Sequence, residues 1–252
     1  GGYGLGGKGI ATTDVRNVPA GIADNKVASD HFHHWKEDIK LMADLGLTLY
    51  RFSFNWTRVM RNGKEVNDEG IAFYNNIIDE CLKFGITPFP TLYHFEMPQH
   101  LVDLYGGWKS RECIDDFVHY AKICFESFGD RVKMWGTINE QMIAIAAKDL
   151  NGNHGVSPEQ SMKDMYQMSY HMSLAEKKAI KEFRALVPDG KIGPVCSMQV
   201  VYPETSSPED IRAARDAQDF LQNCLLDMSV FGCYPKSYTN YLEKQGMLPH
   251  ME

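Results

Sequence analysis

The chain has 252 residues, of which 44% are hydrophobic and 23% are charged, and it carries a formal net charge of −7. These values are ordinary for a globular protein, and no apolar run reaches the roughly 20 residues that a membrane-spanning helix needs. A negative charge without basic clusters argues against a nucleic-acid or anionic membrane partner. The six cysteines form no C-x-x-C pair, which favours reduced thiols and a cytoplasmic location.

The chain opens with GGYGLGGKGIATTD, a glycine-rich segment that partly matches two nucleotide-binding motifs. Gly2, Gly7 and Lys8 fit the G-x-x-x-x-G-K core of a P-loop, and Gly2, Gly4 and Gly7 fit G-x-G-x-x-G. However, Gly9 stands where a P-loop has Ser or Thr, and the residues that follow are too rich in β-branched residues, Pro and Gly to begin a helix. The segment is therefore predicted to be a loop, and no cofactor is expected.

Helix and strand patterns then alternate along the chain. Apolar residues at helical spacing that stop at a glycine predict helices, and runs of apolar and aromatic residues predict strands. Asn67 is the expected N-cap of the second helix, and Ser207 with Pro208 begins the fifth. The predicted helices span 33–46, 67–85, 110–129, about 163–186 and 207–227, and the predicted strands span 47–54, 86–95, 132–140 and 191–203.

Strands that alternate with helices over short connections predict a parallel sheet covered by helices. A closed eight-stranded barrel and a doubly wound open sheet both satisfy this pattern. Polar residues end the predicted strands, at Arg51, at His94–Glu96 and at Asn139–Glu140. In a β/α barrel the catalytic groups lie at such carboxyl ends, so the pattern favours an α/β fold of the (β/α)8 TIM-barrel type.

The spacing of these strand ends limits how much of a barrel the chain can form. Arg51 and His94 are 43 residues apart, and His94 and Glu140 are 46 apart. Eight units at this spacing would need on the order of 400 residues. The prediction is therefore a single partial barrel domain over residues 1–252, with about four strands and outer helices.

Several segments together resemble glycoside hydrolase family 1, the retaining β-glycosidases. Their order and spacing agree with the family over nearly the whole chain. The resemblance implies that the opening glycine-rich loop is an active-site rim, that the family's first strand and its C-terminal half lie outside this sequence, and that the catalytic nucleophile lies in that half. The segments are ASDHFHHWKEDIKLMADLGLTLYRFSFNWTRV, TLYHFEMPQHLVDLYGGW, WGTINE, KIGPVCSMQVVYP and FLQNCLLDMSVFGCYP.

Two motifs bear on the substrate within that family. His-Phe-Glu-Met-Pro, and an Asn-Glu pair that no proline follows, look more like the bacterial 6-phospho-β-glucosidases than the plain β-glucosidases. The resemblance thus implies a β-glucoside substrate, with a phosphorylated glucoside favoured. An unphosphorylated β-glucosidase or β-galactosidase remains the first alternative, and a catalytically silent half-barrel that binds sugar or a partner is the second.

The resemblance assigns roles to five residues. Glu140 matches the general acid/base, although a glutamate at this place would by itself also suit a helix cap or a solvated surface. Asn139 would bind the sugar 2-hydroxyl, with a helix N-cap as its structural alternative, and His94 would bind a ring hydroxyl of the glycone. Phe95 would line the same pocket or pack in the core. Arg51 would point into the barrel and keep the nucleophile ionised, or form a structural salt bridge.

Other conspicuous residues are assigned structural roles. Trp56, Trp108 and Glu96 are expected to pack around the site or support it. The cluster of His31, His33 and His34 fits no common zinc spacing, so a surface cluster at a helix start is expected and no metal site. The methionines at 162, 165, 168 and 172 have helical spacing and indicate a core.

Two expectations concern the isolated chain. Without a nucleophile, it is expected to hydrolyse no β-glucoside at a useful rate. Bare edges of a half-barrel expose unpaired backbone groups and apolar surface, so self-association into a homo-oligomer is left open.

Overall fold

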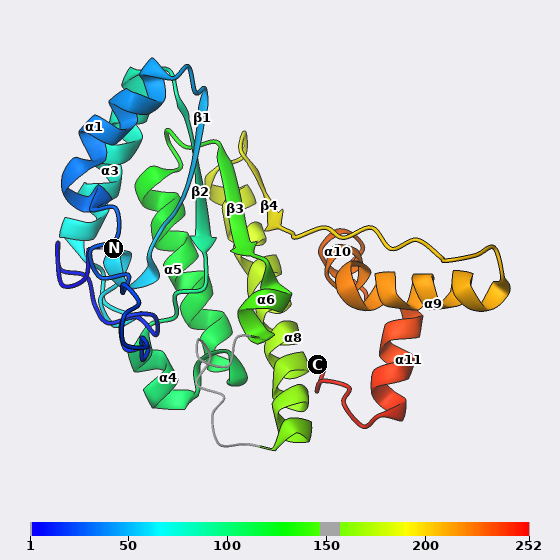
Figure 1. Cartoon of the computed structure of the whole chain (residues 1–252). Coiled ribbons are helices and arrows are strands. Elements are labelled where there is room, and N and C mark those ends of the chain that lie inside the picture. The colour runs from blue at the N-terminus through cyan, green and yellow to red at the C-terminus, as the bar shows by residue number, and fades with distance from the viewer. Residues whose placement is uncertain (1, 147–156, 252) are drawn as a thin grey trace.

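The computed structural model describes residues 2–146 and 157–251, and within these ranges the strands form a four-stranded sheet (Figure 1). The strand order is β1-β2-β3-β4, and every neighbouring pair is parallel, as predicted. The carboxyl ends of all four strands therefore lie at one end of the sheet. The strands are β1 (Leu49–Ser53), β2 (Thr87–Tyr93), β3 (Met134–Asn139) and β4 (Lys191–Val195).

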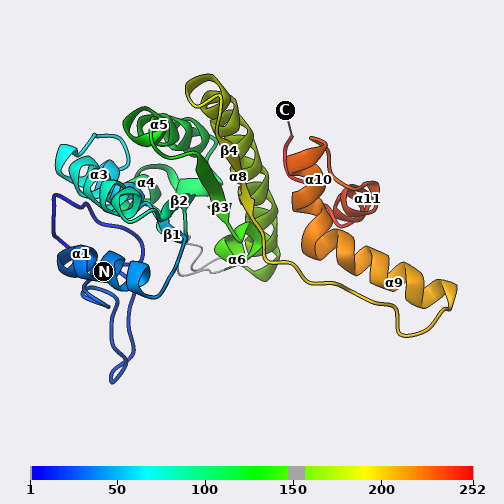
Figure 2. The same ribbon diagram turned by 90° about the horizontal axis from the view of Figure 1, so that it is seen from above.

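Helices connect the strands and cover one face of the curved sheet. The helices α3, α5 and α8 lie along that face, and α1 packs beside α3 (Figure 2). Parallel strands with outer helices make this a partial (β/α) barrel. The helices are α1 (His31–Asp44), α2 (Trp56–Val59), α3 (Asp68–Lys83), α4 (Gln99–Tyr105), η1 (Gly107–Lys109), α5 (Glu112–Phe128), α6 (Gln141–Ala146), α8 (Pro158–Leu186), α9 (Pro208–Gln218), η2 (Asp219–Asn223), α10 (Cys224–Val230) and α11 (Lys236–Lys244).

An aromatic core fills the space between the sheet and these helices. Phe54 follows β1 and lies 4.8 Å from Phe128 of α5, measured between ring centroids. Trp135 of β3 lies 5.1 Å from Phe125 of α5, which in turn lies 5.1 Å from Phe183 of α8. All five side chains are buried, so α5 and α8 are held to the sheet by large apolar area.

The long helix α8 begins earlier than the sequence pattern predicts. The Ser157 hydroxyl accepts a hydrogen bond from the Gln160 amide, and Pro158 occupies the first helical position. Met168 and Met172 are fully buried, as the helical spacing predicts, whereas the exposed fraction of Met162 is 41%. The core stripe of α8 therefore begins after its first turn.

The fourth strand is shorter than predicted. It ends at Val195, and the predicted continuation to about residue 203 forms no ladder. β3 itself ends at Asn139 and α6 begins at Gln141, so the chain beyond Val195 has no strand beside it to accept its hydrogen bonds. A strand needs such a partner, which the local sequence does not specify.

The predicted fifth helix is also divided. In place of one helix over 207–227, α9 ends at Gln218, the π-helical segment η2 spans Asp219–Asn223, and α10 continues to Val230. The predicted start at Ser207 is confirmed, because its hydroxyl accepts a hydrogen bond from the Asp210 amide. The sequence pattern predicts no helix at α2, α4, η1, α6 or α11.

Asn67 is the N-cap residue of α3, as predicted, but its side chain makes no capping hydrogen bond. Its amide nitrogen instead donates to the carbonyl oxygens of Gly6 at 2.9 Å and Arg58 at 2.8 Å. Asn67 therefore fastens the N-terminal loop to the chain after β1, and this distant contact replaces the local one.

The N-terminal segment of residues 2–30 is built of turns and lies against the end of β2. The amide of Thr12 donates to the Met97 carbonyl at 2.8 Å, and the amide of Gln99 donates to the Ile10 carbonyl at 3.0 Å. Lys8, the lysine of the P-loop-like motif, pairs with Asp14 inside the loop. The segment thus has the structure of a loop at the rim of the strand ends.

In the described ranges no helix combines the length and the apolar character that crossing a membrane would require.

Candidate active site

The carboxyl ends of β1, β2 and β3 bring four of the predicted site residues to one end of the sheet. Arg51 lies within β1, His94 follows β2, Asn139 ends β3 and Glu140 comes next. Parallel register places Arg51 opposite Phe89 and Thr91 opposite Gly136, so the three strands present neighbouring side chains on the inner face of the arc.

Arg51 spans the three strands with two hydrogen bonds. Its Nε donates to Thr91 Oγ1 at 3.1 Å, and its Nη2 donates to Asn139 Oδ1 at 2.6 Å. The amide oxygen of Asn139 is therefore occupied by the guanidinium, which orients the amide nitrogen the other way. That nitrogen donates to Glu140 Oε2 at 3.2 Å. The result is a chain of hydrogen bonds from Arg51 to the Glu140 carboxylate.

The backbone at Glu140 is strained. Its φ of 42° lies in the left-handed region, which residues other than glycine rarely adopt. The amide of Glu140 donates to the Val195 carbonyl at 2.8 Å, which extends the ladder between β3 and β4 by one residue. Such conformations cost of order 1–3 kcal/mol and cluster at functional sites. The strain turns the chain sharply from β3 into α6.

Gln141 holds this turn from the other side, and its sequence pattern predicts no such role. Its Nε2 donates to the Ser169 carbonyl at 2.8 Å and to Ser173 Oγ at 3.1 Å, both on α8. Gln141 therefore fixes the start of α6, and with it Glu140, against the long helix. The only sequence signal was the absence of proline after the Asn-Glu pair.

The charges of Arg51 and Glu140, at the two ends of the hydrogen-bond chain, both act on His94. Burial, and secondly the positive charge of Arg51, lower the pKa of His94 below its usual 6.5, while Glu140 acts in the opposite direction. The lowered pKa keeps the imidazole neutral near pH 7, so it can both donate and accept a hydrogen bond.

Phe95 packs both beside His94 and against the core. Its ring lies 4.9 Å from the His94 ring in an edge-to-face arrangement, and the half-buried side chain also packs against the main core. Its φ of 67° is left-handed, like that of Glu140. The chain therefore turns sharply after β2 as well as after β3.

Glu96 supports the loop that carries His94 and Phe95. Thr13 Oγ1 donates to Glu96 Oε1 at 3.1 Å, which joins this loop to the N-terminal segment. Burial raises the pKa of Glu96, and the charge of Lys8 together with the Thr13 hydrogen bond opposes that rise. Trp56 and Trp108 are both buried, and Trp56 stacks on Tyr120 with ring centroids 5.0 Å apart, which fits the predicted packing role.

The three clustered histidines each lie next to a carboxylate. His31 Nδ1 lies 2.5 Å from Asp38, and His33 Nδ1 lies 2.7 Å from Asp30, while His34 is exposed beside the same Asp30. Among the described residues, no group of three or more His, Cys, Asp or Glu side chains is arranged to hold a metal ion.

Comparisons with known proteins identify the family. The model of glycosyl hydrolase family 1 matches residues 1–252. The aryl-phospho-β-D-glucosidase BglC of Bacillus subtilis is 44% identical over 98% of this chain and 52% of its own length. The coniferin β-glucosidase of Pinus contorta is 39% identical over 91% of this chain and 49% of its own length.

Solved structures agree with the sequence relatives. The family 1 β-glucosidase of Thermotoga maritima superposes with a TM-score of 0.86 at 36% identity, over 97% of this chain and 56% of that one. The chain thus spans about half the length of the curated relatives it matches. Matched along its whole length by the family model, and sharing the barrel fold of the solved members, the chain belongs to glycosyl hydrolase family 1.

Proposed function

We propose that the protein containing this chain hydrolyses β-glucosidic bonds with retention of configuration, and that Glu140 is its general acid/base. The observation that carries the proposal is the hydrogen-bond chain from Arg51 through Asn139 to the Glu140 carboxylate, at the carboxyl ends of three parallel strands. A carboxyl group held at this place can protonate the leaving oxygen and later activate water.

The second carboxylate is proposed to come from outside this chain. Retention requires a nucleophile about 5–5.5 Å from the acid/base, and the covalent intermediate forms on it. Arg51 carries a positive charge on the inner face of the arc, where it would favour the ionised form of such a nucleophile. An anionic nucleophile would in turn repel a negative charge on the neighbouring Glu140 and so favour the form that carries the proton.

Asn139, His94 and Phe95 are proposed to hold the glycone. The Asn139 amide lies beside Glu140, where a bond to the 2-hydroxyl would strengthen as positive charge develops at the anomeric carbon. Neutral His94 can exchange hydrogen bonds with a ring hydroxyl, and the adjacent ring of Phe95 offers an apolar surface to the sugar.

For the substrate, we propose an aryl 6-phospho-β-glucoside. The first relative named above is an aryl-phospho-β-D-glucosidase, and the His94–Pro98 motif and the Gln after Glu140 both favour this subgroup. A plain β-glucoside is the alternative, because the coniferin β-glucosidase is also a relative. A β-galactoside is a further alternative within the same class.

The test compares kcat/KM of the full-length protein on an aryl 6-phospho-β-glucoside and on the same aryl β-glucoside. The proposal expects a preference for the phosphorylated substrate of at least about 100-fold, because a buried phosphate site recognises charge that the plain sugar lacks. The opposite preference would assign the plain glucoside. If the wild-type protein turns over neither substrate and Glu140→Gln is equally inactive, the protein is a catalytically silent barrel that binds sugar or a partner.

The compartment is proposed to be the bacterial cytoplasm. All six cysteines are unpaired thiols, and Cys81, Cys113, Cys124 and Cys224 are buried in the described structure. Reduced thiols are usual in the cytoplasm and unusual in secreted proteins.

A further inference from the structure

Arg58 is a buried arginine beneath the N-terminal loop. It lies on α2, directly after β1, and its exposed fraction is 3%. Within the described ranges Arg58 forms no ion pair with a carboxylate. A buried positive charge of this kind must be stabilised by hydrogen-bond acceptors and by the faces of aromatic rings.

The N-terminal loop supplies the hydrogen-bond acceptors. Nη2 of Arg58 donates to the Gly2 carbonyl at 3.0 Å, and Nη1 donates to the Leu5 carbonyl at 2.8 Å. The guanidinium also lies over the rings of Phe32 and Phe73, with its central carbon 4.7 Å and 5.1 Å from the two ring centroids. Arg58 therefore binds the start of the loop to α1 and α3.

Residues 2–9, which we call the rim loop, contain no helix or strand that would fix their shape. Gly2 and Gly4 both have a left-handed φ, of 76° and 67°. A Cβ atom added at Gly2 would lie 2.6 Å from Nη2 of Arg58, whereas one added at Gly4 would meet no atom within 4 Å. Glycine at position 2 is thus what allows Arg58 to approach the loop so closely.

The chain after the rim loop is bonded to the turn that carries His94 and Phe95. The amide of Thr12 donates to the Met97 carbonyl at 2.8 Å, and two further hydrogen bonds join residues 10–13 to this turn. The order that Arg58 gives to the rim loop therefore extends to the end of β2.

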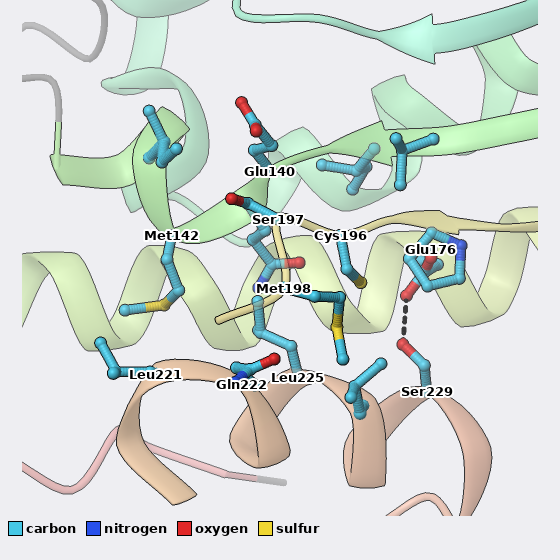
Figure 3. A pocket seen from close by; sticks show the side chains of 16 residues that line it. Glu140, Met142, Glu176, Cys196, Ser197, Met198, Leu221, Gln222, Leu225 and Ser229 are labelled. Atoms are coloured by element: carbon cyan, nitrogen blue, oxygen red, sulfur yellow. Dashed lines mark hydrogen bonds between the residues drawn. The ribbon is translucent and has the colours of Figure 1, made fainter. Parts of the chain in front are cut away.

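Glu140 is held by a different set of contacts. Its amide donates to the Val195 carbonyl at 2.8 Å. Figure 3 shows Glu140 on the side of the sheet that carries Met142 of α6 and Ser197, which follows β4. The loss of Arg58 should therefore leave Glu140 in place.

We propose that Arg58 is a positioning residue for the glycone site. It orders the rim loop and thereby holds the turn of residues 94–99 where His94 and Phe95 can meet the sugar. The proposal rests on the hydrolytic function proposed above. Because Glu140 is held separately, the loss of Arg58 should weaken glycone binding more than it slows the chemical step.

The experiment compares Arg58→Met and Arg58→Lys with the wild-type full-length protein, on the aryl glucoside that the wild type prefers. Arg58→Met is expected to raise KM about tenfold while kcat stays within about threefold. Hydrogen–deuterium exchange should become faster at residues 2–13 and 94–99. Lysine keeps the charge but cannot reach both carbonyls, so Arg58→Lys should show the same changes at smaller size.

Arg131→Met is the matched control for a general loss of stability. Arg131 precedes β3, at the opposite end of the sheet from the site, and pairs with Asp79 of α3. The variant should lower the melting temperature and leave KM and the exchange at residues 2–13 and 94–99 unchanged.

A second matched pair leaves Arg58 itself intact and decides the question if Arg58→Met does not fold. Gly2→Ala and Gly4→Ala both place a side chain at a left-handed residue, but only the first collides with the guanidinium. Gly2→Ala should therefore reproduce the rise in KM and the faster exchange, and Gly4→Ala should not.

Three results would overturn the proposal. Unchanged exchange at residues 2–13 in Arg58→Met would show that Arg58 does not order the rim loop. Faster exchange there with an unchanged KM would show that this order does not reach the glycone site. Equal changes in Arg131→Met would assign the effect to stability alone.

Failure of the proposed function is a separate outcome. A full-length protein that turns over neither glucoside would end the hydrolytic proposal. The exchange at residues 94–99 in Arg58→Met and Gly2→Ala would then decide whether Arg58 holds the turn, and unchanged exchange in both variants would contradict it.

Discussion

The guanidinium of Arg51 donates from Nη2 to the side-chain oxygen of Asn139 at 2.6 Å, across two strand boundaries. This bond fixes which end of the Asn139 amide faces Glu140. The proposed acid/base is therefore oriented by a residue 89 positions earlier in the sequence, through a neighbour that the sequence places beside it.

Arg51→Lys tests this relationship. A lysine ammonium lacks the planar fork that reaches Thr91 and Asn139 together, so the Asn139 amide should lose its fixed orientation. We expect kcat/KM of the full-length protein to fall by about 100-fold, in line with the loss of one oriented charged donor. Arg184→Lys on an exposed part of α8 is the matched control, and an equal loss in the control would contradict the assignment.

Glu140→Ala tests the acid/base role by leaving-group dependence. Substrates with poor leaving groups should lose nearly all turnover, because the departing oxygen needs a proton. Activated aryl glycosides should still form the glycosyl-enzyme, which then accumulates because water is no longer activated. Pre-steady-state kinetics should show this burst.

Azide completes that test. It is nucleophilic without deprotonation and fits the space that the carboxylate vacates, so it should restore the second step and give the β-glycosyl azide. Equal loss on both substrate types without azide rescue would instead mark Glu140 as structural or as the nucleophile.

The lowered pKa of His94 predicts how the stability of the protein depends on pH. Burial and Arg51 lower its pKa from 6.5, so the unfolded chain takes up a proton before the folded chain does as the pH falls. Wild type should therefore lose stability below about pH 6.5, and His94→Gln should lose less between pH 7 and pH 5. Urea unfolding at pH 7 and pH 5 measures this difference in the free energy of unfolding. A titration midpoint above 6.5 for His94 in NMR would contradict the lowered pKa.

Glu176→Gln should stabilise the protein at neutral and alkaline pH. Burial raises the pKa of Glu176 above 4.5, so the folded chain binds a proton more tightly than the unfolded chain, and wild-type stability falls as the pH rises above that value. Glutamine has no charge to bury. One of the Thr137 and Ser229 hydroxyls can keep donating to its amide oxygen, and the other can rotate to accept from its amide nitrogen.

The gain in melting temperature for Glu176→Gln should therefore be larger at pH 8 than at pH 5. Glu243→Gln on the exposed face of α11 is the control and should show little change at either pH. A gain that shrinks as the pH rises would contradict the raised pKa.

Local patterns predicted the elements that depend on the chain itself. The period of apolar residues in α1, α3 and α5 and their glycine stops located three helices, and Ser207 correctly marked the start of α9. The alternation of strands and helices correctly predicted a parallel sheet, and the polar residues at the strand ends correctly favoured a barrel. These features follow from local backbone geometry and side-chain burial, so nearby sequence is sufficient to predict them.

Only the tertiary structure decided the features that depend on distant partners. The side chain of Asn67 bonds to Gly6 and Arg58 and makes no capping bond to its own helix. β4 stops at Val195, opposite Asn139, the last residue of β3. The orientation of the Asn139 amide likewise depends on Arg51. Each of these hydrogen bonds joins groups brought together by strand register and helix packing. A group's partner is therefore set by the folded geometry, which the residue's own neighbours in the sequence do not encode.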